Sequence, residues 1–148
     1  MDTSEQNIKM LEKAVEIQRL WKPADGDFAW HPNEGVEHLG CWEFPAEKAV
    51  VKITEQQDAD WWLNWTWLPH LAQLQDALIE AGVDCWIWEL MEYFTPNSDA
   101  PIFVARNTVD RASFYTGNSA EIALLKLLYS EKYNKIWNGE DWEVANAS

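Results

Sequence analysis

No apolar run in the chain approaches the ~18 residues that a membrane-spanning helix needs, so the sequence predicts no membrane anchor. Its polar beginning, MDTSEQNIKM, lacks the basic and apolar regions of a secretory signal. Two cysteines among 148 residues are too few for a disulfide framework. No glycine lies in a phosphate-binding loop, because no Gly-Lys-Ser or Gly-Lys-Thr follows any of them. These absences favour a protein of a reducing cytoplasm and exclude the phosphate-loop enzymes.

Basic residues are also scarce. The chain carries 11 lysines and arginines against 25 acidic residues, and its net charge of −14 disfavours direct binding to nucleic acid or to anionic lipid. The imbalance is central, because residues 23–105 hold 15 acidic residues and only two lysines, and residues 53–105 hold no lysine or arginine. Such a block is either a solvated acidic face or a docking surface for a partner of opposite charge.

Tryptophan, by contrast, is abundant: the chain has 11, and four of them crowd into seven positions. Tryptophan is rarely fully buried and is enriched at interface hot spots. A core shared by sheet and helices would also use these rings, notably Trp65, Trp86 and Trp88. If Trp61 and Trp62 lie on a strand, they face opposite ways, so at least one of them is expected to be exposed.

Apolar residues at helical spacing predict three helices, over Glu5–Trp21, from Pro69 to Gly82 and from Asn118 to Gly139. Thr3 with Gln6 is the expected capping box of the first helix, and Asn118 with Glu121 is that of the last. Alternating residues predict strands over 38–44, 48–54, 60–67, 84–94, 102–106 and 112–116.

The segment from Pro23 to Gly40 is rich in Pro, Gly, Asp and Asn, and is expected to hold turns around short extended pieces, with little regular structure. The order of the other elements predicts an α+β fold, a mostly antiparallel sheet packed by about three helices. Because no linker or repeat interrupts the chain, a single domain over residues 1–148 is the expectation.

One group of proteins has three stretches of similar residues in the same order as this chain. In this chain they read LWKPADGDF, WLPHLAQLQDALIEAG and SAEIALLKLLYSEKYNKIWNGEDWE. The chain resembles small hypothetical proteins of bacteriophages and prophages of Gram-positive bacteria. The resemblance implies a phage accessory protein that acts in the cytoplasm of the bacterial host, but it implies no particular activity. The matching positions are Trp21, Pro23, Gly26, Asp27, Trp67, Leu68, Pro69, Tyr133, Lys135, Trp137, Gly139, Glu140 and Trp142.

The sequence offers no catalytic or metal-binding set with an established spacing. Potential ligands crowd together between His31 and Cys41, but Glu37 and His38 are adjacent and would face opposite ways on a strand. Carboxylate pairs such as Asp58 with Asp60 are expected by chance in so acidic a chain. The sequence therefore predicts no catalytic residue, no metal and no cofactor.

The preferred functional hypothesis is a non-enzymatic protein that docks an acidic, tryptophan-bearing surface onto a host protein with a basic surface, such as a defence nuclease whose nucleic-acid groove it would occupy. The predicted interaction residues are Asp58, Asp60, Trp61, Trp62, Asp76, Glu80, Asp84, Glu89 and Glu92.

Two alternatives stay open. A small-ligand protein would sequester a nucleotide by stacking it on tryptophan rings and holding its phosphate with basic residues. The residues predicted for that role are Lys48, Lys52, Arg106 and Arg111. The other alternative is an enzyme of unassigned class.

Overall fold

The computed structural model describes residues 2–24, 26–40, 50–52, 59–83, 85–90, 102–107 and 114–145, with side chains for all of these except 50–52, 59–60 and 85–90. The chain divides into an N-terminal unit, residues 3–70, and a C-terminal unit, residues 71–148 together with residues 1–2. Both units combine helices with sheets in which antiparallel pairing dominates, so the predicted α+β class is confirmed. The single domain over residues 1–148 stays a prediction.

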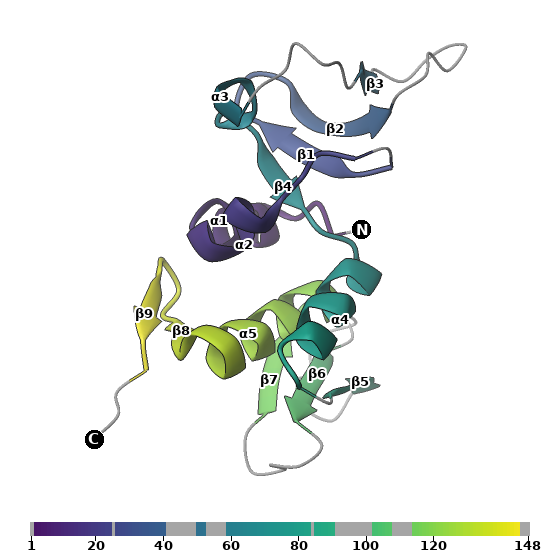
Figure 1. Cartoon of the computed structure of the whole chain (residues 1–148). Coiled ribbons are helices and arrows are strands. Elements are labelled where there is room, and N and C mark those ends of the chain that lie inside the picture. The colour runs from purple at the N-terminus through teal and green to yellow at the C-terminus, as the bar shows by residue number, and fades with distance from the viewer. Residues whose placement is uncertain are drawn as a thin grey trace. The chain divides into compact units, whose positions relative to one another are not determined.

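The N-terminal unit contains a sheet of strand order β3-β2-β1-β4. Its strands are β1 (Phe28–His31), β2 (Gly35–Gly40), β3 (Val50–Lys52) and β4 (Thr66–Leu68). β1 pairs antiparallel with β2 and β4, whereas β3 joins β2 in parallel (Figure 1). The prediction of little regular structure over residues 23–40 is therefore wrong. Gly35, at a φ of 78°, ends the turn that closes the β1–β2 hairpin.

The predicted helix Glu5–Trp21 is two helices, α1 (Glu5–Glu12) and α2 (Val15–Leu20). The break lies at Ala14, which is fully buried and has a ψ of 63°, outside the helical range. Burial of this small residue outweighs the continuous helical pattern of the sequence. Ser4, rather than the predicted Thr3, caps α1, because its hydroxyl accepts a hydrogen bond from the backbone N–H of Asn7.

The predicted strand over residues 60–67 is also wrong in its first half. A one-turn helix, α3 (Ala59–Trp62), comes first, and only Thr66–Leu68 is extended. Trp61, Trp62 and Trp65 recur at intervals of three and four, which fits a helical turn as well as their alternation fits a strand. The core decides between the two, because the helical turn buries both Trp62 and Trp65.

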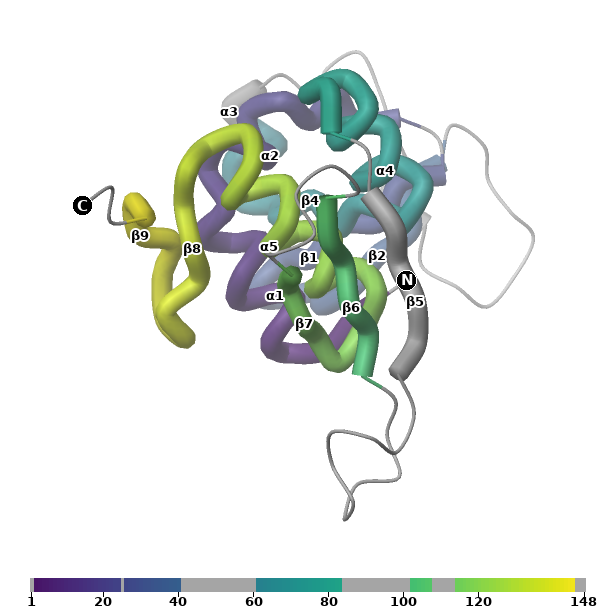
Figure 2. Tube along the Cα trace, turned by 90° about the horizontal axis from the view of Figure 1, so that it is seen from below, coloured from purple at the N-terminus to yellow at the C-terminus, as the bar shows by residue number. Residues whose placement is uncertain are grey.

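The C-terminal unit is built on an antiparallel sheet of β5 (Cys85–Leu90), β6 (Ile102–Asn107) and β7 (Phe114–Gly117), in that order. The predicted strand pair over 102–106 and 112–116 is confirmed, and the turn predicted between them lies outside the described residues. Helix α5 (Ala120–Tyr133) packs on β6 and β7 and against α4 (Leu71–Glu80), as Figures 1 and 2 show.

Helix α4 begins two residues after Pro69, the predicted first residue, and ends at Glu80, just before the predicted stop at Gly82. Gly82 has a φ of 75°, and the N–H of Val83 donates back to the carbonyl of Leu78. This left-handed glycine satisfies carbonyl groups that the last helical turn leaves open.

Most of the buried apolar side chains described in the C-terminal unit belong to helix α5, from Ile122 to Tyr129. Ser119, rather than the predicted Asn118, caps it by accepting from the N–H of Ile122. The helix ends at Asn134 in the left-handed conformation, before the predicted stop at Gly139.

A hairpin of β8 (Lys135–Trp137) and β9 (Trp142–Val144) follows α5. The ring of Trp142 stacks on Tyr129 with a centroid distance of 4.1 Å, which fastens the hairpin to the helix. None of the helices in the described part of the chain has the length and the apolar character that crossing a bilayer requires.

Candidate functional site

An aromatic cluster occupies one face of the sheet in the N-terminal unit. Trp62 meets Trp21 edge-on at 5.3 Å and Trp61 edge-on at 4.5 Å, measured between ring centroids. Trp61 also stacks on Trp65 at 6.0 Å with an interplanar angle of 17°. The cluster consists of Trp21, His31, Trp61, Trp62, Trp65 and Trp67.

The members of this cluster differ in exposure. Trp62 and Trp65 retain only 9% and 8% of their accessible surface and belong to a core with Ala29 and Leu39. Trp61 is 41% exposed, and Leu63 after it is 77% exposed. The prediction that at least one of Trp61 and Trp62 is exposed is confirmed, but the reason is a helical turn and not a strand. The result is an exposed indole held against buried rings.

Hydrogen bonds from two side chains hold members of the aromatic cluster in place. Asp27, which is almost fully buried, accepts from the indole Nε1 of Trp21 and from the backbone N–H of Ala24, both at 2.9 Å. The amide of Gln18 on α2 accepts from the N–H of Trp67 at 2.7 Å and donates to the carbonyl of Trp67 at 3.1 Å. The rings are therefore positioned before any partner arrives.

A carboxyl group lies on the same sheet face. Glu37 is the register partner of Ala29 and lies two residues from Leu39, so all three side chains share the core-facing side of the sheet. Partial burial raises the pKa of Glu37, and the neighbouring charge of Glu34 raises it further.

The histidines near Glu37 do not join it as metal ligands. His38 lies on the opposite sheet face and stacks on Phe28, as its place beside Glu37 on a strand predicts. His31 packs against Trp65, and its Nδ1 accepts from the N–H of Asn33, which places the ring proton of the neutral form on Nε2. Among the described residues, no three His, Cys, Asp or Glu side chains gather as a metal site, and Cys41 lies outside them.

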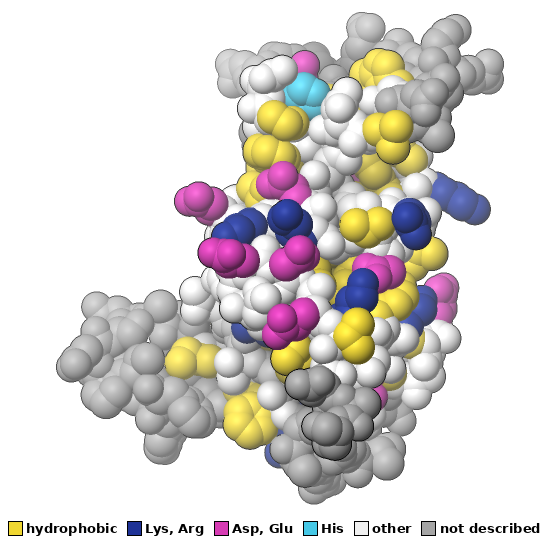
Figure 3. Space-filling view, turned by 90° about the vertical axis from the view of Figure 1, so that its left-hand side faces the viewer, with side chains coloured by type: hydrophobic (Ala, Val, Ile, Leu, Met, Phe, Trp, Pro, Cys, Tyr) yellow, Lys and Arg dark blue, Asp and Glu magenta, His cyan; other side chains and the backbone are white. Residues whose placement is uncertain are grey.

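The predicted acidic residues divide between the two units. Asp60 lies in α3 directly before Trp61, and Glu89 lies in β5, each placed by its backbone. Asp76 and Glu80 are exposed on α4 in the C-terminal unit. Three further predicted residues, Asp58, Asp84 and Glu92, lie outside the described residues. On the face that Figure 3 presents, acidic and basic side chains are interspersed.

The basic residues predicted for a small ligand are also divided. Lys52 belongs to β3 of the N-terminal unit and Arg106 to β6 of the C-terminal unit, whereas Lys48 and Arg111 lie outside the described residues. Sequence reasoning missed Lys126 on α5, which lines a groove of the C-terminal unit.

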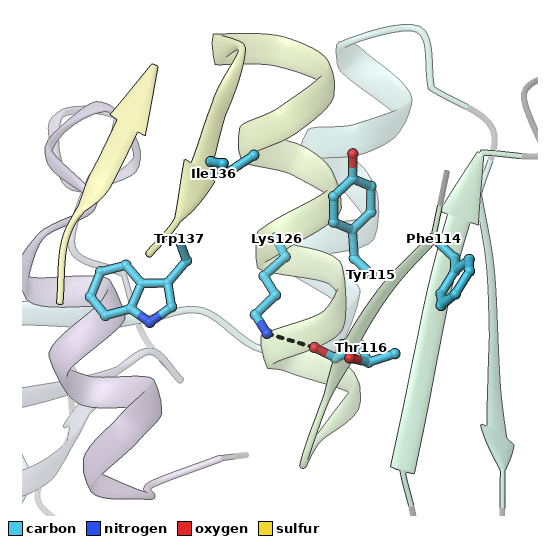
Figure 4. Close-up of a pocket in the computed structure, with 6 residues that line it drawn as sticks. All are labelled: Phe114, Tyr115, Thr116, Lys126, Ile136 and Trp137. Atoms are coloured by element: carbon cyan, nitrogen blue, oxygen red, sulfur yellow. Dashed lines mark hydrogen bonds between the residues drawn. The ribbon is translucent and has the colours of Figure 1, made fainter. Parts of the chain in front are cut away.

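This groove has a volume of about 230 Å³ and is lined by Phe114, Tyr115, Thr116, Lys126, Ile136 and Trp137. Figure 4 shows the side chain of Lys126 between β7 on one side and Trp137 of β8 on the other. Its ammonium donates to the backbone carbonyl of Thr116 at 2.7 Å, and burial lowers its pKa. The sequence signal was a lysine set in the run LLKLL, where both leucines on each side are buried.

These two features suggest different contacts. The aromatic cluster offers a rigid indole beside an exposed leucine, and the groove offers one ammonium beside aromatic rings. Comparison of the chain with models of protein families, with curated proteins and with solved structures found no match to any of them.

Proposed function

We propose that the chain is a non-enzymatic phage accessory protein that binds a host protein through the exposed end of its aromatic cluster. The observation that carries the proposal is the pairing of Trp61, 41% exposed, with Leu63, 77% exposed, on a turn anchored by buried Trp62 and Trp65. The partner is a protein with a basic surface, such as a defence nuclease that the chain would inhibit as an acidic mimic of nucleic acid.

The physical support comes from preorganisation and charge. A tryptophan already packed against fixed rings loses little conformational freedom on binding, and such residues are the commonest interface hot spots. Asp60 directly precedes Trp61, and the chain as a whole carries a net charge of −14, so a basic partner would be steered toward this surface. Aromatic contact would then supply affinity, and charge would supply the rate of association.

The test uses the intact chain as bait for a lysate of the bacterial host, with the captured partner then purified and its affinity measured by calorimetry. We expect Trp61→Ser to weaken binding by about 30-fold, since a hot-spot tryptophan contributes about 2 kcal/mol. Ile79→Ser on α4 is the matched control, because Ile79 is a large apolar residue with 70% exposure. Affinity of the wild-type chain should fall as salt rises, because the surfaces have opposite charge.

Two outcomes contradict the proposal. One is capture of no partner at low salt. The other is a partner that binds the Trp61→Ser and Ile79→Ser variants equally well. If binding does not depend on salt, the proposed contribution of the acidic residues to binding is wrong. In that case the double variant Asp58→Asn, Asp60→Asn should bind with the affinity of the wild-type chain.

A further inference from the structure

The groove of the C-terminal unit has a charge opposite to that of the chain. Of the six residues that line it, Lys126 is the one charged residue, in a chain whose net charge is −14. Among the described residues, its ammonium has the carbonyl of Thr116 as a hydrogen-bond partner and no carboxylate. A lysine ammonium has three donors, so the groove offers unused donors to an anion.

One wall of the groove is β7, which is an edge strand of its sheet in the part of the chain that the structure describes. β7 is the last strand in the order β5-β6-β7, and it pairs with β6 on its other side. The carbonyl of Thr116 points away from β6, because it accepts from Lys126 across the groove (Figure 4). Backbone groups alternate along an antiparallel strand, so those of Phe114, two residues away, point into the groove as well. An extended backbone can pair with this edge.

The side chains of β7 also alternate. Tyr115 hydrogen bonds to Ser130 of α5, and Gly117 lies against Ile122 of α5, so these two residues face the helix. Phe114, 59% exposed, therefore faces the other way, as does Thr116. A strand added beside β7 would direct every second side chain toward Lys126 and the others to the face of Phe114.

We propose that this groove binds an acidic peptide segment in extended conformation, which pairs with β7 and places one glutamate or aspartate carboxylate against Lys126. The carboxylate would draw the ammonium away from the carbonyl of Thr116. That carbonyl would then accept an N–H from the peptide backbone. Charge recognition and strand pairing are coupled in this way, because the group that recognises the carboxylate also covers the edge in the free protein.

The site is independent of the function proposed above, because it lies in the C-terminal unit and uses none of the aromatic cluster. The Trp61→Ser variant should therefore bind the peptide as the wild-type chain does. Failure of the peptide to bind would leave the partner of the aromatic cluster unaffected.

The experiment measures anisotropy of a fluorescein-labelled, amidated peptide, Ser-Thr-Val-Glu-Val-Thr, titrated with the full chain. Its glutamate would face Lys126, and its valines would face the side of Phe114. We expect saturable binding, weakened about tenfold or more when glutamine replaces the glutamate of the peptide or in the Lys126→Gln variant. Lys132→Gln is the matched control, since Lys132 is an exposed lysine of the same helix and should leave affinity unchanged.

Strand pairing is tested separately. Thr116→Pro removes an N–H that points into the groove without removing a bond to β6, so it should weaken binding while circular dichroism stays that of the wild type. Glutarate, a carboxylate without a strand backbone, should compete poorly. Equal affinity for the glutamate and glutamine peptides, an unaffected Lys126→Gln variant, or competition by glutarate as strong as by unlabelled peptide would overturn the proposal.

Discussion

The side-chain amide of Gln18 hydrogen bonds to the outer edge of β4. Removing this amide should lower the stability of the N-terminal unit by a measurable amount. Both backbone groups of Trp67 bond to this amide, at 2.7 and 3.1 Å. Each such bond contributes about 0.5–1.5 kcal/mol net, and water can replace part of it because the contact is only partly buried. We therefore expect Gln18→Ala to lower the free energy of unfolding by about 1–2 kcal/mol.

The assay is urea unfolding followed by circular dichroism, together with hydrogen exchange at the amide of Trp67. With an m-value of about 2 kcal/mol per molar urea, the midpoint should fall by about 0.5–1 M. Exchange of the Trp67 amide should speed up more than exchange in the C-terminal unit. Gln75→Ala, an exposed glutamine on α4, should change stability by less than about 0.5 kcal/mol.

A second substitution separates hydrogen bonding from packing. Gln18→Met keeps the length of the side chain but can neither donate nor accept in the same way, so it should lose nearly as much stability as Gln18→Ala. If Gln18→Met unfolds at the wild-type midpoint, or if Gln18→Ala matches the Gln75→Ala control, the two bonds contribute nothing and the reasoning is refuted.

Three further variants test other features. Because the pKa of Glu37 is raised in the folded chain by burial and by Glu34, its contribution to stability is present below the ordinary glutamate pKa of about 4.3 and is lost as pH rises through the folded value. Glu37→Gln should thus raise the urea midpoint at pH 7 but leave it unchanged in acid; a gain of the same size at both pH values would contradict this. Gly117→Ala would place a Cβ 2.6 Å from Cγ2 of Ile122, so it should lower Tm through a loss of about 1–3 kcal/mol, and an unchanged Tm would show that α5 can shift. Asn134→Ala at a φ of 52° should cost about 1 kcal/mol in a thermal scan, whereas Asn134→Gly should not, and equal effects of the two would exclude the left-handed backbone as the cause.

The elements that the sequence predicts well are those in which local pattern and burial agree. In helix α5 every residue from Ile122 to Tyr129 except Lys126 is buried, and the residues of β7 alternate between exposed and partly buried. The predicted and observed helices differ partly at their ends, because neighbouring polar residues compete for the cap, as Ser119 does with Asn118.

The errors in the N-terminal unit have a different cause. A run such as WWLNWTW satisfies both a period of two and a period of three to four, so its conformation depends on which rings the core receives. The β1–β2 hairpin was missed because a buried Ala29 and a paired His31 look unlike a strand in isolation. Their pairing with β2 and β4 supplies what local propensity lacks.

The candidate site shows the same limit. The sequence predicts exposure of one member of the Trp61–Trp62 pair from strand geometry, whereas the structure exposes Trp61 on a helical turn, where adjacent side chains also point in different directions. Lys126 could not be placed from the sequence, because its groove forms only when β7 and β8 come to lie on either side of α5. A lysine within a run of buried leucines indicates that it lines a groove, but the sequence does not show which residues lie opposite the lysine.

The near-parallel indoles of the aromatic cluster give the protein an optical property. The rings of Trp21 and Trp67 are tilted by only 3° at 6.4 Å, and those of Trp61 and Trp65 by 17° at 6.0 Å. The strong electronic transitions of indole rings this close couple as excitons, which adds paired bands of opposite sign to the far-ultraviolet circular dichroism. Loss of this signature would mark the melting of one half of the chain without any dye or label.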